Sequence, residues 1–100
     1  MIYAYRLHAF ATEELGEAYE WYENKQSGLG ERFLRAVHKK IDEIALHPQT
    51  YSSRGKKDYR EVKVEFFPYV IVYRVLTRKK EIYISAIHNT NKNPERKYRK

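Results

Sequence analysis

Residues 59–88 have the sequence YREVKVEFFPYVIVYRVLTRKKEIYISAIH, which contains three consecutive stretches with the pattern of β-strands. In residues 59–66 apolar and charged side chains alternate, the period of a strand with one buried face. Residues 69–76 form an almost unbroken run of β-branched and aromatic residues, typical of a central strand. Residues 82–87 form the third run. Because only short turns separate the three, we expect an antiparallel meander.

The alternation in residues 59–66 assigns the side chains of this strand to two faces. The face that carries the charged side chains is expected to be exposed to water. The apolar parity, which Arg60 shares, is expected to face the core and consists of Val62, Val64 and Phe66. Phe67-Pro68 then lies at the first turn, where the missing N–H of proline costs no ladder hydrogen bond.

A strand and two helices are expected before the meander. Residues 2–7 alternate as a strand does, and Thr12 is a suitable N-cap for a helix that runs to about Gln26. After a glycine-containing turn, the apolar pattern restarts at Phe33 in a second helix, which ends before Pro48 because the residue before a proline is pushed out of the helical region. The apolar stripes consist of Leu15, Ala18, Tyr19 and Tyr22 in the first helix and Phe33, Leu34, Val37, Ile41, Ile44 and Ala45 in the second.

The predicted fold is therefore α+β, with the element order β-α-α-β-β-β. We expect a two-helix antiparallel hairpin packed on a four-stranded antiparallel sheet. One hundred residues are enough for one domain, which we place at residues 1–88, followed by a basic C-terminal tail at residues 89–100.

Several classes of protein are disfavoured by composition. The chain has no cysteine, no apolar run near twenty residues and no signal peptide, so we expect a cytoplasmic protein without a membrane partner. Phosphate-binding and metal-binding motifs are absent, and we expect neither a cofactor nor a metal. His8, His38 and His47 are scattered and are expected to be structural or solvated.

The formal charge of +7 is unevenly distributed. Residues 1–50 carry six Lys and Arg against eight Asp and Glu, whereas residues 51–100 carry fourteen against five. This asymmetry favours a polyanionic or acidic partner on one face, and it is equally compatible with a role in solubility alone.

Particular residues in this order resemble the RelE/ParE superfamily of bacterial toxins, and the resemblance covers essentially the whole chain. The matching residues are Glu20-Trp21-Tyr22-Glu23, Gly28-Leu29-Gly30 with Phe33-Leu34, Ile44 to Pro48, Arg60, Phe67-Pro68-Tyr69, Ile71 to Val75, Ala86-Ile87-His88 and Asn93-Pro94. The resemblance implies the toxin of a type II toxin–antitoxin, or plasmid stabilisation, system, bound by a cognate acidic antitoxin.

The resemblance also bears on the target of the toxin. Members similar to RelE cut messenger RNA on the ribosome with the help of cations, but this chain has Val70 and Asn89 at two positions where such nucleases commonly carry basic residues. The chain looks more like ParE, which implies inhibition of DNA gyrase without nucleolytic chemistry. If the chain is instead a nuclease, its catalytic residues would be Arg60, Lys63, His88 and Tyr98; a third alternative is a non-toxic remnant that only binds an antitoxin.

Candidate binding residues follow from these alternatives. Target binding is assigned to Arg60, Arg74, His88, Lys92, Arg96 and Arg99, and antitoxin binding to Trp21, Tyr22 and Arg60. Four of these residues have a structural alternative. Arg60 could pair with a helix glutamate, Arg74 could form an ion pair in its apolar strand, His88 could only hydrogen-bond at a strand end, and Tyr22 could belong to the core.

Overall fold

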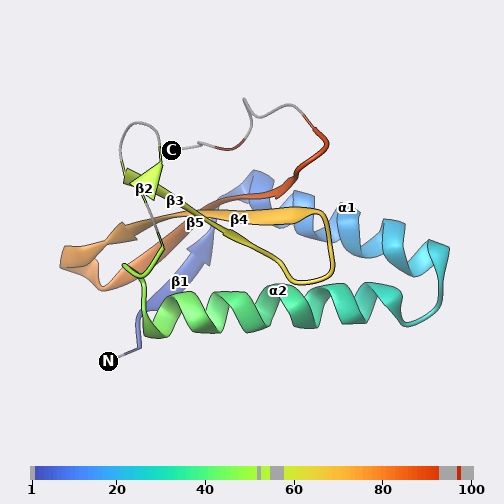
Figure 1. Cartoon of the computed structure of the whole chain (residues 1–100), viewed down its shortest axis with the longest axis horizontal. Helices are drawn as coiled ribbons and strands as arrows, with labels where there is room; N and C mark the ends of the chain where they lie inside the picture. The colour runs from blue at the N-terminus through green and yellow to red at the C-terminus, as the bar shows by residue number, and fades with distance from the viewer. Residues whose placement is uncertain (1, 52, 55–57, 93–96, 98–100) are drawn as a thin grey trace.

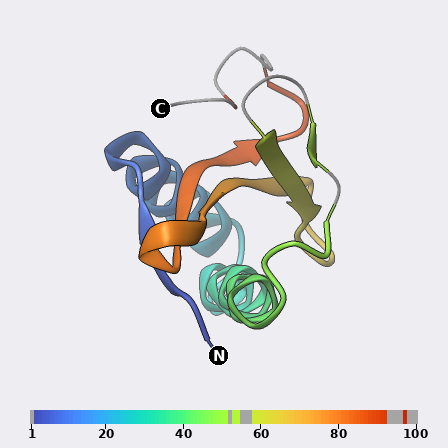
Figure 2. The same ribbon diagram turned by 90° about the vertical axis from the view of Figure 1, so that its left-hand side faces the viewer.

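The computed structural model describes residues 2–51, 53–54, 58–92 and 97, and its two helices lie together against one side of a twisted sheet (Figures 1 and 2). The α+β class and the order of the main elements are confirmed. The elements are β1 (Ala4–Leu7), α1 (Ala9–Lys25), α2 (Leu29–Leu46), β2 (Ser53–Arg54), β3 (Tyr59–Lys63), β4 (Tyr69–Leu76), the 3₁₀ turn η2 (Thr77–Lys79) and β5 (Glu81–Asn89).

The sheet has the order β1-β5-β4-β3-β2 and is mixed, which corrects the prediction that it is antiparallel throughout. The meander β3-β4-β5 is antiparallel as expected, and the two-residue β2, which lies between α2 and β3, extends it by one short strand. β1, however, runs parallel to β5. The reason is the return path of α2, which ends beside the start of β1, where the Tyr3 N–H donates to the Ala45 carbonyl at 3.1 Å. β3 therefore starts from that same end, and two reversals give β5 the direction of β1.

The first helix begins earlier than the sequence predicts. His8, not Thr12, is the N-cap of α1, and its Nδ1 accepts a hydrogen bond from the Phe10 N–H at 3.0 Å. Thr12 lies in the first turn, where its N–H donates to the His8 carbonyl at 3.0 Å. The prediction was wrong because β1 ends at Leu7 and a single residue joins the strand to the helix.

The turn between the helices is held by one carboxylate. Gly28 has a φ of 89°, and Glu23 accepts hydrogen bonds from the N–H groups of Gly28 and Gly30, both at 2.9 Å. Gly30 lies directly against α1, where a Cβ atom would come within 2.7 Å of the Tyr19 carbonyl oxygen. The glycine thus permits the close approach of the two helices.

The core fills the space between the helices and the sheet, and the predicted stripe of α2 faces it. At the end near the β3–β4 turn it is aromatic. The rings of Tyr22 and Phe67 have centroids 4.9 Å apart, and Phe33 lies 5.0 Å from Tyr69 and 5.2 Å from Phe67. The core-packing alternative for Tyr22 is therefore confirmed, since this side chain is buried.

Phe66 does not follow the predicted alternation. β3 ends at Lys63, and Phe66 lies in the turn with a φ of 70° and a side chain that is 93% exposed. Phe67 takes the place in the core instead. The prediction was wrong because the strand period stops where the turn begins.

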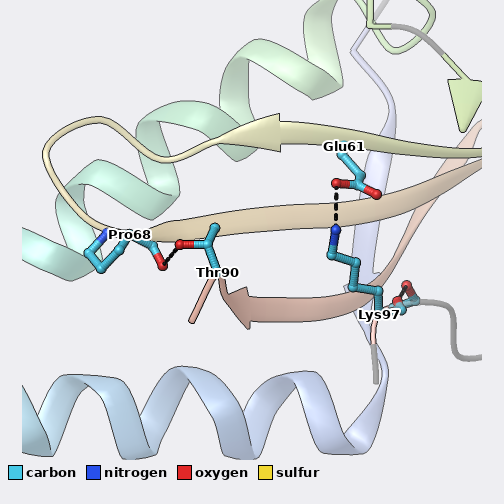
Figure 3. Close-up of polar contacts among 5 residues, drawn as sticks. Glu61, Pro68, Thr90 and Lys97 are labelled. Atoms are coloured by element: carbon cyan, nitrogen blue, oxygen red, sulfur yellow. Dashed lines mark hydrogen bonds and ion pairs between the residues drawn. The ribbon is translucent and has the colours of Figure 1, made fainter. Parts of the chain in front are cut away.

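A second, small cluster lies on the side of the sheet away from the helices and consists of Tyr59, Val70, Val72 and Ala86. Lys97 packs at this side: its Nζ lies 3.2 Å from Glu61 Oε1, and its carbonyl accepts a hydrogen bond from Ser85 Oγ at 2.8 Å. Figure 3 shows the Lys97–Glu61 pair and, at the start of β4, the Thr90 hydroxyl donating to the Pro68 carbonyl. The division of the chain at residue 88 stays a prediction.

Within the described ranges, no helix combines the length and the hydropathy that crossing a bilayer requires.

Candidate functional site

A groove of about 560 Å³ lies between α1 and the C-terminal end of β5. Its wall on α1 carries Glu14, Glu17 and Trp21, and Tyr22 and Tyr69 also line it. The opposite wall consists of His88, Asn89, Asn91 and Lys92 together with Pro68. The groove therefore brings together four of the predicted binding residues, Trp21, Tyr22, His88 and Lys92.

The groove exists because β1 is shorter than β5. The last pair between these strands joins Leu7 to Ile84, so among the described residues no strand lies beside the outer edge of β5 beyond Ile84. α1 crosses this edge, and Glu14 Oε1 accepts a hydrogen bond from the Ile87 N–H at 3.0 Å. A side-chain carboxylate thus occupies the place where a neighbouring strand would offer a carbonyl.

The two tyrosines of the groove are neutral phenols. Burial raises the pKa of the Tyr69 phenol, and the charges of Glu14 and Glu17 raise it as well. A hydrogen bond from Asn89 Nδ2 to the Tyr69 hydroxyl, at 3.4 Å, lowers this pKa. Burial, followed by the neighbouring Tyr69, also raises the pKa of Tyr22. Both phenols therefore keep their protons at neutral pH and present aromatic surface with a hydroxyl.

His88 is buried and only 3% exposed. Burial lowers the pKa of its imidazole, and the Lys97 charge lowers it further. Glu14, a hydrogen bond with the Lys92 backbone and Glu61 act in the opposite direction. The imidazole is therefore neutral at neutral pH, which agrees with the hydrogen-bonding alternative for this residue.

Of the four predicted binding residues in the groove, Trp21 and Lys92 are the accessible ones. The indole of Trp21 is 56% exposed, and the Lys25 ammonium lies 4.8 Å from its ring centroid. Lys92 is also exposed. An exposed indole beside polar and charged side chains is typical of a protein-binding groove.

Arg60 lies outside the groove, at the helix side of the sheet. It pairs with Tyr73 across β3 and β4, and its Nη1 donates to the Tyr51 carbonyl. The Tyr73 hydroxyl donates to the Pro48 carbonyl at 2.8 Å, and burial raises the pKa of this phenol to about 12 although the Arg60 charge lowers it. Arg60 thus helps to fix the chain that leaves α2, and its binding roles stay predictions.

The remaining predicted residues lie on the side of the sheet away from the helices or outside the described residues. The Arg74 guanidinium lies 5.6 Å from the Tyr59 ring centroid, a cation–π contact, and it forms no ion pair with another described residue. Arg6 lies 4.5 Å from the Tyr83 ring, and Tyr83 pairs with Arg74, so both arginines flank one tyrosine. Lys63 is exposed. Arg96, Tyr98 and Arg99 lie outside the described residues, as does Asn93-Pro94.

Sequence reasoning missed Glu14, Tyr69 and Asn89 as members of a site. Glu14 has the ordinary signature of a carboxylate in the first turns of a helix. Its contact with Ile87 depends on where α1 crosses β5, and no local signal encodes that crossing.

We predict that the protein loses stability as the pH falls from about 7.5 to about 5.5, because His88 binds a proton more readily when unfolded. The lowered pKa means that its stabilising contribution is complete above the ordinary value of 6.5 and is lost as the pH falls towards the pKa of the folded state. Urea denaturation at several pH values measures this. His88→Gln should flatten the dependence in that window, whereas His38→Gln, on the exposed side of α2, should retain it. An unchanged profile in His88→Gln would contradict this assignment.

Comparison with solved structures places the fold in a known class of toxins. A chain of the chromosomal ParDE toxin–antitoxin system from P. aeruginosa is similar with a TM-score of 0.73 and 16% identity, over 88% of this chain and 96% of that one. The E. coli toxin RelE, as a double arginine mutant in the free state, is similar with a TM-score of 0.69 and 20% identity, over 96% and 90%. The isolated E. coli RelE toxin gives 0.66 and 19%, over 93% and 89%.

The family follows from the sequence. The family model described as the ParE toxin of the type II toxin–antitoxin system, parDE, matches residues 5–94. The chain therefore belongs to the ParE toxin family, which confirms the predicted RelE/ParE superfamily. A search of curated proteins finds no match.

Proposed function

We propose that this chain arrests growth by ParE-like inhibition of DNA gyrase and that it does so without cleaving nucleic acid. The observation that carries the proposal is the pair formed by Val70 and His88 across β4 and β5. Val70 is 7% exposed, and His88 is buried with a lowered pKa. Neither side chain offers the accessible positive charge that stabilises a scissile phosphate.

The position after His88 supports the same proposal. The amide of Asn89 donates to the Tyr69 hydroxyl, and the Asn89 Oδ1 atom accepts the Asn91 N–H at 2.8 Å. The Asn89 side chain thus stabilises the turn that follows β5. The contact surface for the target is instead proposed to be electrostatic, with Arg74 and Lys92 among its cations.

The proposed partner in the resting state is a cognate acidic antitoxin, as part of a plasmid stabilisation system. The groove supports this, because exposed Trp21 beside the neutral phenols of Tyr22 and Tyr69 suits an added peptide segment. Glu14 and Glu17 make this groove acidic on one wall, so the acidic side chains of the antitoxin are expected to contact the basic surfaces outside it.

The test is induction of the chain in bacterial cells, alone and together with the antitoxin encoded beside it. We expect growth arrest that the antitoxin relieves, loss of gyrase supercoiling activity with the purified chain, and intact messenger RNA on ribosomes. Val70→Arg serves as a control. It introduces a cation at the position where the similar nucleases carry one, and we expect that this change alone does not create cleavage of messenger RNA.

Two results would overturn the proposal. Cleavage of messenger RNA that His88→Ala abolishes, with supercoiling unaffected, would establish the nuclease. Normal growth after induction, with a stable antitoxin complex, would establish a binding module without toxicity.

A further inference from the structure

Phe66 is displayed on the outside of the protein by the turn between β3 and β4. Its side chain is 93% exposed, and its φ of 70° lies in the left-handed region, which is unfavourable for an aromatic residue. Local sequence preference therefore does not explain this conformation.

The turn is fixed by its neighbours. Phe67 is anchored between the rings of Tyr22 and Phe33, at 4.9 and 5.2 Å. Beyond it the Tyr69 N–H donates to the Phe67 carbonyl at 2.8 Å, and the Val64 N–H donates to the Tyr69 carbonyl at 3.0 Å. With Phe67 anchored inside, Phe66 is held outside in one place, which lowers the entropy that a partner must remove on binding.

Beside Phe66 lies a second cavity, of about 260 Å³, between the turn and α2. Its apolar part is made by Phe66, Phe67 and Ala36. Its rim carries Arg32, Arg35 and Lys39, which follow one another at the i, i+3 and i+7 positions of α2, together with Glu65. The turn thus supplies most of the apolar part of the cavity, and the regular helix α2 holds the three cations in a row along its rim.

The rim cations are available to a partner. Arg32 is exposed and forms no ion pair with any other described residue. Arg35 lies 3.5 Å from Glu31, and their side chains are 75% and 65% exposed. An ion pair this exposed is weak, and a partner carboxylate can replace it. Lys39, in contrast, lies 3.1 Å from Glu65.

We propose that this surface, consisting of Arg32, Arg35, Ala36, Lys39, Phe66 and Phe67, docks an acidic segment of the antitoxin that carries one apolar anchor. The anchor enters the cavity against Phe66, and flanking carboxylates pair with Arg32 and Arg35. The inference rests on the proposed antitoxin partner and assigns to it a second contact surface, separate from the groove at Trp21.

The arrangement of charge favours a protein segment over a nucleic acid. Glu31 and Glu65 lie among the three cations, so a continuous chain of phosphates would meet carboxylates along its path. Separate carboxylates on a peptide can instead meet the cations individually. The cavity is also of a size for a single side chain.

The test measures the dissociation constant of the full-length chain for the antitoxin encoded beside it, with Phe66→Ser and Arg32→Glu as variants. We expect each to weaken binding by roughly tenfold or more, as for a central aromatic or arginine in an interface. Leu46→Ser is the matched control, because Leu46 is 51% exposed at the far end of the same helix, and its dissociation constant should stay within about twofold of the wild type. Thermal unfolding of Phe66→Ser should match that of the wild type, since the side chain contributes little to the core.

The outcomes separate this inference from the proposed function. If the wild-type chain and the antitoxin do not associate, the proposed partner is wrong and the inference falls with it. Tight binding by the wild type together with unchanged binding by both variants would overturn the inference alone. Loss of binding to a single-stranded DNA oligonucleotide in both variants, with antitoxin binding retained, would overturn it in favour of a nucleic-acid surface.

Discussion

Phe33→Ala is expected to lower the free energy of unfolding by about 3–5 kcal/mol. Phe33 is completely buried, and its ring contacts those of Tyr22, Phe67 and Tyr69 at centroid distances of 5.0 to 5.2 Å. Truncation removes apolar burial and leaves a cavity that three anchored rings cannot fill. Because a domain of this size has only about 5–15 kcal/mol in total, the variant should be close to unfolding at 37 °C.

Urea denaturation followed by circular dichroism measures this loss. Phe33→Leu, which keeps most of the apolar volume, is the control and should lose less than half as much as Phe33→Ala. A loss of less than about 1 kcal/mol in Phe33→Ala would mean that the aromatic cluster does not support the fold.

Gly30→Ala should have the second largest effect, a loss of about 2–3 kcal/mol. The added Cβ would lie 2.7 Å from the Tyr19 carbonyl oxygen and 2.9 Å from Glu23 Oε1. The carbonyl belongs to the backbone of α1 and cannot move away alone, and displacing Glu23 would also weaken its hydrogen bonds to Gly28 and Gly30. The higher helix propensity of alanine, about 1 kcal/mol, offsets only part of this strain.

The matched control is Gly16→Ala in α1, where a Cβ atom would meet nothing within 4 Å. Here only the propensity acts, so the variant should be more stable than the wild type by about 0.5–1 kcal/mol. A loss of stability in Gly30→Ala together with a gain in Gly16→Ala, measured by thermal unfolding, would show that the contact with α1 decides the effect of the added Cβ atom. Equal stabilisation at both would refute the close approach at Gly30.

Local patterns in the sequence predict most of the fold. The predicted bounds of β4 agree with the structure. Pro68 marks its start, the charged turn marks its end, and the β-branched run between them favours a strand. The stripe of α2 is also predicted correctly, since its apolar positions repeat with the helical period. The direction of β1 could not be predicted in this way, because it depends on the contact between Tyr3 and Ala45.

The candidate site was predicted only as separate parts. Trp21 and Tyr22 belong to one predicted set, and His88 and Lys92 to another. The structure brings these four residues to one groove because α1 crosses the edge of β5 beyond its pairing with β1. The outward position of Phe66 was hidden for a related reason: Phe66 and Phe67 are equally apolar, and the turn geometry alone decides which of them enters the core.

The pairing of β1 with β5 constrains the order in which the parts of the chain can fold. Ala4 lies beside Glu81, so two segments that are synthesised far apart in time become neighbours in the sheet. The helical hairpin has local contacts and can form early, whereas β1 has no sheet partner until Glu81–Asn89 has left the ribosome. Since the groove requires both α1 and the end of β5, a nascent chain interrupted before Glu81 carries the exposed indole of Trp21 without the wall that faces it. A partner that needs both walls of this groove would therefore bind only to chains in which the last strand has been synthesised.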